Sequence, residues 1–382
     1  MTAASLFAQP MGWPQALAWA EAHVAAWRAA DRECPVLDGA TVPGSSYQGY
    51  AAAVALLGRV GALDPTRLTE VAEAMGTQQV LAPADQELLR RLEPALAALR
   101  EAAHRSGGPG SWPGPETTGD DVPWLDVLPL VDGLRLAARE HARAGRHEAA
   151  RQTLLDGLAV GADLAHGIVP VCARIGDVIV ERMLGEFDEA WLAAAGDEPL
   201  ARLAAALAAV DAALPLVHDP LGDAAATFVL ALARRERWTA GDLGLPSALI
   251  AWRHGFSVRH YGMSLATQEV EAAIAFAAAT PAAEPWPQRR ARLAVVAAAS
   301  RRARIGAWPG FAEHVVEAEE HRREVVARLR LLRLAVDWHR GVRSEPLADP
   351  FGDGPLTAVP TAAGVVFASE RPGLQRGAFA AR

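Results

Sequence analysis

The sequence predicts an all-α protein, an irregular α-solenoid of antiparallel helix pairs that ends in a short β-hairpin. Hydrophobic residues make up 51% of the chain, and much of this fraction is alanine, which favours helix wherever glycine or proline does not interrupt it. In residues 126–167, apolar side chains recur at three- and four-residue spacing on both sides of a glycine. After Gly341 the composition changes to turn residues around two short apolar segments, which is typical of a hairpin.

Residues 126–167 carry the clearest pattern in the chain. The apolar stripe before Gly145 and the stripe after it predict two amphipathic helices joined by a tight turn. These stripes comprise Leu130, Leu134, Ala137, Ala138 and His141, then Ala149, Ala150, Thr153, Leu154, Gly157 and Leu158. Small residues in both helices let the two axes approach closely. They are Ala138, Ala142, Ala150 and Gly157.

This hairpin resembles the inner half of a tetratricopeptide repeat, whose turn reads Gly-basic-x-acidic-x-Ala followed by a large residue and a second small one. The matching residues are Gly145, Arg146, Glu148, Ala150, Leu154 and Gly157. Gly157 stands where alanine is usual in the repeat. The resemblance covers about a tenth of the chain, and it implies an architecture of stacked helix pairs rather than an activity.

Helices are expected along most of the remaining chain, because proline, glycine and aspartate mark starts and stops between alanine-rich segments. The expected helices outside the hairpin span residues 14–32, 49–60, 66–75, 83–104, 169–184, 186–195, 199–214, 224–236, 247–254, 265–279, 288–305 and 310–339. The last one is long for a globular helix and is expected to span the whole body. Residues 34–50 are expected to form a loop, and residues 356–359 and 364–368 the two strands of the hairpin.

Residues 106–123 mark the predicted division of the chain. They contain five glycines and four prolines, a composition that cannot sustain a helix. We therefore expect this segment to be a loop or linker between an N-terminal helical bundle, residues 1–105, and a helical-repeat-like domain, residues 124–340. The tail with the hairpin, residues 341–382, follows.

Composition excludes several classes of protein. The net charge of −8 argues against nucleic-acid binding, although all 37 basic residues are arginine and the chain contains no lysine. Cys34 and Cys172 form no CxxC motif, so neither a disulfide scaffold nor a structural zinc site is indicated. The first residues do not read as a secretory signal, and no apolar run is long enough for a membrane span. These features predict a cytoplasmic protein.

A wider resemblance rests on the order of several segments. They are LLRRLEPALAALREAAHR, the central hairpin, ARLRLLRLAVDWHRG, PLADPFGDGPLTA and GVVFAS. Over about residues 88–370 this order is similar to a group of uncharacterised, tetratricopeptide-like helical proteins of GC-rich bacteria such as planctomycetes and myxobacteria. The tail, with its Asp-Pro-aromatic-Gly turn at Asp349, also resembles the carboxyl end of type II secretion pseudopilins. The chain lacks the pilin's N-terminal hydrophobic helix, and the group implies no catalytic residue.

Residues 252–261 form the candidate binding site. Cations, imidazoles and aromatic rings gather there within ten residues, at a predicted helix break. Bidentate arginines and aromatic stacking could hold an anion or a peptide carboxylate. The alternative is that the aromatic rings close a corner of the core while the arginines face water. The candidate residues are Trp252, Arg253, His254, Arg259, His260 and Tyr261.

The last long helix offers a candidate metal site. His314, Glu317, His321 and Glu324 recur at a spacing that places them along one helical face. A di-iron bundle, however, requires two Glu-x-x-His motifs, and Glu101 to His104 is the one copy in the chain. Charged residues surround the helix on every side, which favours a solvated face with intrahelical ion pairs.

The sequence contains no GxSxG, glycine-rich phosphate loop, HExxH or Rossmann fingerprint. We therefore expect no catalytic residue and no cofactor. The leading hypothesis is a non-enzymatic helical scaffold or adaptor that binds another protein through a groove between helices. Two alternatives remain: an all-α enzyme or small-ligand carrier with a pocket near residues 252–261, and an accessory component of a secretion or pilus-like system. The oligomeric state stays open.

Overall fold

A computed structural model of the chain confirms that the protein is mostly helical. The structure describes residues 11–29, 37–59, 65–74, 80–107, 124–167, 170–214, 216, 219–234, 258–280, 284–303, 311–362 and 364–376. This described part contains thirteen α-helices. None of the described helices combines the length and the hydropathy that a membrane crossing requires.

The helices of the described part fall into two groups along the chain. The first group comprises α1 (Trp13–Ala29), α2 (Ser46–Arg59), α3 (Pro65–Ala74), α4 (Pro83–Ala103), α5 (Val127–Arg143), α6 (His147–Leu164) and α7 (Pro170–Leu184). The second group comprises α8 (Glu189–Ala194), α9 (Asp197–Ala213), α10 (Pro220–Arg234), α12 (Val258–Ala279), α13 (Trp286–Ala303) and α14 (Phe311–Arg340). A 3-10 turn, Trp124–Asp126, leads into α5.

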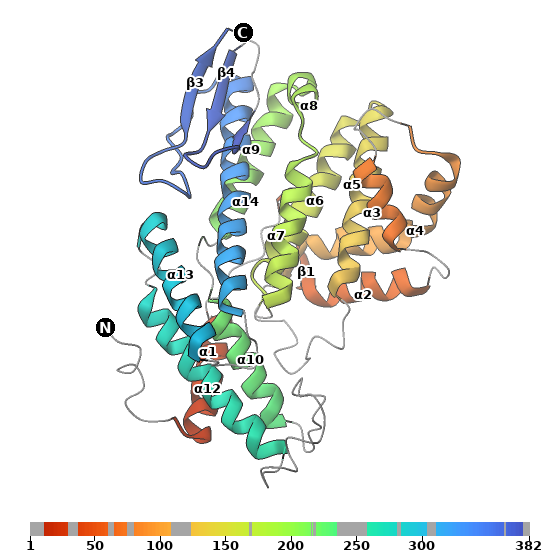
Figure 1. Cartoon of the computed structure of the whole chain (residues 1–382). Coiled ribbons are helices and arrows are strands. Elements are labelled where there is room, and N and C mark those ends of the chain that lie inside the picture. Colours follow the sequence, from red (N-terminus) through yellow and green to blue (C-terminus); the bar gives the residue numbers. More distant parts are fainter. Residues whose placement is uncertain are drawn as a thin grey trace.

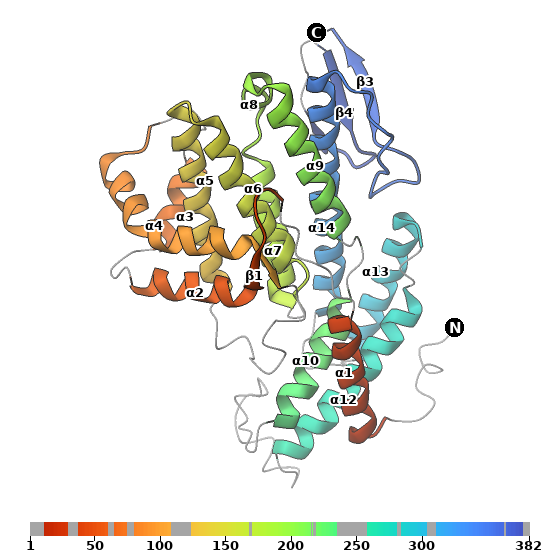
Figure 2. The ribbon, with the colours of Figure 1, turned by 180° about the vertical axis from the view of Figure 1, so that it is seen from behind.

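The helices gather into two lobes that α14 joins (Figures 1 and 2). One lobe holds α2 to α9, with α6 in contact with α4, α5, α7 and α9. In the other lobe α1 packs on α10 and α12, although it precedes the whole first lobe in sequence. Because α14 runs from the second lobe past α7 and α9 to the C-terminal sheet, it spans the body as expected.

The α5–α6 hairpin forms where the sequence predicts it, and Gly145 ends α5. Gly145 has a φ of 73°, in the left-handed region that glycine tolerates best. Its N–H donates to the carbonyl of Ala142 at 3.0 Å, and the N–H of Arg146 donates to the carbonyl of His141 at 2.8 Å. This pair of bonds is the Schellman motif, which satisfies the last carbonyls of a helix and turns the chain back.

Glycines bring α6 and α7 into close contact. A Cβ atom on Gly176 would lie 2.6 Å from the carbonyl oxygen of Gly161 and nearer still to the backbone nitrogen of Ala165. A Cβ atom on Gly157 would lie 2.7 Å from the sulfur of Met183. Met183 therefore occupies the space that a Cβ atom at position 157 would need. As a result, α6 is buried along nearly its whole length.

The C-terminal hairpin is confirmed and gains a third strand. The antiparallel sheet has the order β3 (Thr357–Thr361), β4 (Gly364–Ala368), β5 (Gln375–Arg376). Phe367 of β4 is buried against the helical core, whereas every residue of β3 is exposed. The sequence predicted the first two strands but missed β5, whose two residues carry no strand pattern.

Two further predictions were wrong. Residues 34–50 were expected to form a loop, but β1 (Val42–Ser45) pairs in parallel with β2 (Arg105–Gly107). A helix break was expected up to about residue 264, but α12 already begins at Val258. The division of the chain at residues 106–123 stays a prediction, and one hydrophobic core extends on both sides of it, from Tyr47 to Phe367.

The contact between α6 and α7 predicts a strongly unfavourable substitution. Gly176→Ala forces a methyl group into the backbone of α6, where no flexible side chain can move away. We expect a loss of about 3 kcal/mol or more in the free energy of unfolding, at or above the upper end of typical overpacking costs. Urea denaturation followed by circular dichroism measures this loss.

Gly58→Ala is the matched control, because Gly58 is an exposed residue of α2 and has no atom near its Cβ position. Alanine is the better helix former, so this variant should gain about 0.5–1 kcal/mol. A Gly176→Ala protein as stable as the wild type would contradict the proposed contact.

Candidate functional site

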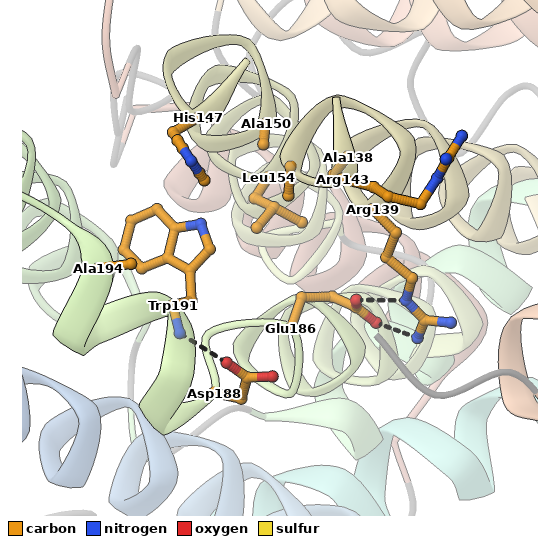
Figure 3. A pocket seen from close by; sticks show the side chains of 11 residues that line it. Ala138, Arg139, Arg143, His147, Ala150, Leu154, Glu186, Asp188, Trp191 and Ala194 are labelled. Carbon is orange, nitrogen blue, oxygen red and sulfur yellow. Dashed lines mark hydrogen bonds and ion pairs between the residues drawn. The ribbon is translucent and has the colours of Figure 1, made fainter. Parts of the chain in front are cut away.

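A pocket of about 280 Å³ lies between the α5–α6 hairpin and α8 (Figure 3). Its walls come from the last turns of α5, the first turns of α6, the turn after α7, and α8. The lining residues are Ala138, Arg139, Ala142, Arg143, His147, Ala150, Leu154, Glu186, Asp188, Trp191 and Ala194. The site therefore depends on the same hairpin that the sequence identified most clearly.

The hairpin side of the pocket is made of small apolar residues. They are Ala138 and Ala142 of α5 and Ala150 and Leu154 of α6. In the sequence, these alanines predict a close approach of the two helix axes. The structure adds a second consequence: short side chains leave a hollow on the face of the hairpin that is turned towards α8. An apolar hollow of this kind accepts an apolar group.

The opposite wall is held by Asp188 and Trp191. The Asp188 carboxylate accepts a 2.8 Å hydrogen bond from the backbone N–H of Trp191 and so caps the N-terminus of α8. The Trp191 ring packs edge-to-face on the buried Phe187, with ring centroids 5.1 Å apart. The indole Nε1 of Trp191 is buried and has no hydrogen-bond partner among the described residues. A buried donor without a partner costs about 1–3 kcal/mol.

An ion-pair network forms the base of the pocket. Glu186, which is only 6% exposed, accepts hydrogen bonds from Arg139 Nε at 2.7 Å and Arg139 Nη2 at 2.7 Å. It also accepts a 2.8 Å hydrogen bond from Arg135 Nε. Arg139 Nη1 donates to the carbonyl of Ala72 on α3 at 3.0 Å. The turn after α7 is thereby fixed to α5 and α3.

Asp132 extends the network away from the pocket. This fully buried carboxylate accepts from Arg135 Nη1 at 2.8 Å, Arg182 Nη1 at 2.6 Å and Thr69 Oγ1 at 2.8 Å. Burial alone would lower the pKa of Arg135, but the charge of Glu186 and the hydrogen bonds to both carboxylates raise it above its ordinary value. Arg135 therefore stays charged in this network.

The pocket is chemically suited to binding. Its eleven lining residues include no serine, threonine, cysteine or tyrosine that could act as a nucleophile. Both oxygens of Glu186 are occupied by arginines, and Arg143 forms a bidentate pair with Glu140. What remains for a ligand is the apolar hollow, the indole of Trp191 and the exposed imidazole of His147 at the rim.

The sequence-predicted binding cluster is not part of this pocket. Trp252, Arg253 and His254 lie outside the described residues. Arg259, His260 and Tyr261 lie in the first turns of α12, and their side chains are outside the described part of the structure. The pocket lining includes none of the six, and the prediction that they bind a ligand stays a prediction.

The candidate metal ligands lie on α14, as the spacing predicted. The side chain of His314 is not among those described, and Glu317 is exposed. His321 lies 3.8 Å from the carboxylate of Glu181 on α7, and burial together with nearby arginines lowers the pKa of its imidazole to about 4. Glu324 pairs with Arg371 of the tail. Within the described residues, no three histidines, cysteines or carboxylates gather in a metal-binding arrangement.

Sequence reasoning missed three residues that shape the pocket. Arg139, Glu186 and Trp191 come from α5, the turn after α7, and α8. Arg139 and Glu186 are 47 residues apart, and an ion pair between such distant residues leaves no local pattern in the sequence. The one available signal was Asp188 followed three residues later by the aromatic Trp191, which marks a capped helix start.

A second buried titratable pair lies in the other lobe. His23 Nε2 of α1 lies 2.7 Å from the carboxylate of Asp223 on α10, and Trp19 stacks on the imidazole. Burial raises the pKa of Asp223 to about 6. Burial alone would lower the pKa of His23, but the hydrogen bond and charge of Asp223, with the charge of Asp219, raise it. The pair fastens α1 to α10.

Comparison with known proteins adds no relative. No family model matches the chain, and no curated protein or solved structure matches it significantly. The resemblance to the helical proteins of GC-rich bacteria therefore stays a prediction. The geometry of the pocket is the basis for a functional proposal.

The network at the base of the pocket predicts a large effect of Glu186→Gln. This substitution removes the carboxylate that Arg135 and Arg139 share in a buried environment. We expect a loss of about 3–5 kcal/mol in the free energy of unfolding, as for other broken buried ion pairs. Chemical denaturation measures it. In the control Glu140→Gln, which removes the partner of the partly exposed Arg143, the loss should be about 0.5 kcal/mol or less.

The pair in the other lobe predicts a pH-dependent stability. Because the pKa of His23 in the folded state is raised, its stabilising effect is complete below its unfolded pKa of about 6.5 and is lost as the pH rises through the folded value. His23→Gln should therefore cost about 1–3 kcal/mol near pH 6 and clearly less near pH 9. Thermal unfolding across this range measures the difference. If the stability difference between the wild type and His23→Gln stayed constant with pH, the ionic pair would be ruled out. The control is His147→Gln, which changes an exposed histidine and should leave the stability unchanged.

Proposed function

We propose that the chain is a non-enzymatic helical scaffold of tetratricopeptide-like helix pairs, which binds another protein by inserting one of that protein's side chains into the pocket between the α5–α6 hairpin and α8. The observation that carries this proposal is the composition of the pocket. Alanines and Leu154 offer an apolar hollow, Trp191 offers an aromatic wall, and the charged groups beneath are already paired with one another.

The size of the pocket supports a side chain as the occupant. At about 280 Å³, the pocket lies just below the range of roughly 300–1,000 Å³ that is usual for small-molecule and cofactor sites. Binding sites for proteins commonly take one aromatic or aliphatic anchor in a pocket and surround it with weaker contacts. The turn between α5 and α6 can supply such weaker contacts, because Arg143, Arg146 and His147 are all exposed there.

Trp191 also supports binding rather than a purely structural role. A side chain placed in the pocket would pack against the aromatic ring of Trp191, which forms part of the lining. Figure 3 shows the indole on the α8 side of the pocket, across from Leu154 on the hairpin side. An anchor placed between these two side chains would contact both walls at once.

The test is a peptide selection against two matched variants. Ala194 and Ala193 are exposed neighbours on α8, but only Ala194 lines the pocket. Peptides enriched from a random display library on the wild-type chain should share one aromatic or aliphatic residue. Ala194→Phe fills the pocket and should weaken their binding on the order of tenfold or more, as expected for loss of an anchor.

Ala193→Phe adds the same side chain outside the pocket and should change the affinity less than about twofold, since contacts outside an anchor are nearly neutral. Fluorescence anisotropy with labelled peptides measures both values. Equal binding to Ala194→Phe and to the wild type, or a library that yields no enriched peptide, would contradict the proposal.

A further inference from the structure

The C-terminal sheet reaches the pocket wall through its last described residue. Arg376 of β5 donates a hydrogen bond from Nη2 to the carbonyl oxygen of Phe187, in the turn that precedes α8. Phe187 is fully buried and supports the ring of Trp191. Arg376 and Phe187 are 189 residues apart in sequence, and their hydrogen bond lies next to the residue that supports Trp191.

The environment of Arg376 indicates that the hydrogen bond to Phe187 fixes the position of the guanidinium. Burial lowers the pKa of its guanidinium to about 10, and the nearby charges of Glu189 and Asp188 oppose that effect. A guanidinium that loses this much water is stable only while its acceptors stay in place. Asp188 is also the residue that caps α8, so the cation and the cap occupy the same turn.

Other contacts also hold α8, among them the burial of Leu192 in the main hydrophobic core. Glu186 fixes the start of the turn to α5, and His339 of α14 lies 3.1 Å from the carboxylate of Glu189. The helix itself has only six residues, too few to be stable without tertiary contacts. The tail therefore supplies one of the interactions on which the position of Trp191 depends.

We propose that β5 is a strap: docking of Arg376 onto the turn at Phe187 holds the α8 wall in place and so sets the affinity of the pocket. This inference rests on the proposed function and adds a means of regulating it. Because coupling between two sites is reciprocal, a partner in the pocket also stabilises the docked tail. Release of β5 loosens α8, and the pocket loses its aromatic wall.

Hydrogen exchange on the ligand-free chain tests the strap without requiring any partner. In Arg376→Ala, the amides of residues 187–194 should exchange on the order of tenfold faster, since a hydrogen bond from a charged donor is lost. The amides of α6 should stay as protected as in the wild type, which shows that the fold is intact. Arg376→Lys keeps a cation at this position and should restore part of the protection.

Gln375→Ala is the matched control, because Gln375 is the exposed neighbour of Arg376 on β5. It should leave exchange in residues 187–194 unchanged. Unchanged exchange in Arg376→Ala would overturn the strap, whatever the pocket binds. Faster exchange without weaker binding of the selected peptides would overturn the claim that the strap sets affinity. Failure of the peptide selection alone would instead count against the proposed function.

Discussion

Burial of α6 along nearly its whole length is the constraint on which the rest of the structure depends. Gly161 and Gly176 bring the backbones of α6 and α7 together so closely that no side chain fits between them at that point. With α4, α5 and α9 on its other sides, α6 has almost no exposed surface. An interior at this packing density transmits any change in one helix to its neighbours. The position of the hairpin, and therefore of the pocket, follows from this contact.

Burial of α6 also dictates where its polar side chains must find partners. A buried charge without a partner costs several kcal/mol, so the buried charged residues of α6 need partners in neighbouring segments. Three pairs link α6 to the loop before β1, to α4 and to α2. They are Arg151 with Asp38, Asp156 with His104, and Asp163 with Tyr50. The N-terminal segments are thus ordered by the polar groups of the central helix, in addition to its apolar ones.

The sequence predicted the features that depend on local pattern. The α5–α6 hairpin could be placed because its apolar spacing and Gly145 act within a few residues. The pair β1–β2 could not, because it joins segments about 60 residues apart through strands too short to show alternation. The wall of the pocket could not be predicted from the sequence for the same reason. Glu186 and Trp191 acquire their roles from α5 and from the tail, and neither contact leaves a signal near those residues.

The pocket exists because a short helix covers a surface that a longer one would fill. In a regular array of helix pairs, each hairpin packs its small residues against the next hairpin, and the hollow between alanines is occupied. Here the neighbour of the α5–α6 hairpin on this side is α8, which has only six residues. Because α8 contributes Trp191 at one edge and ends at Ala194, the hollow lined by Ala142 and Ala150 stays open. The alanines that permit the hairpin therefore also create the pocket.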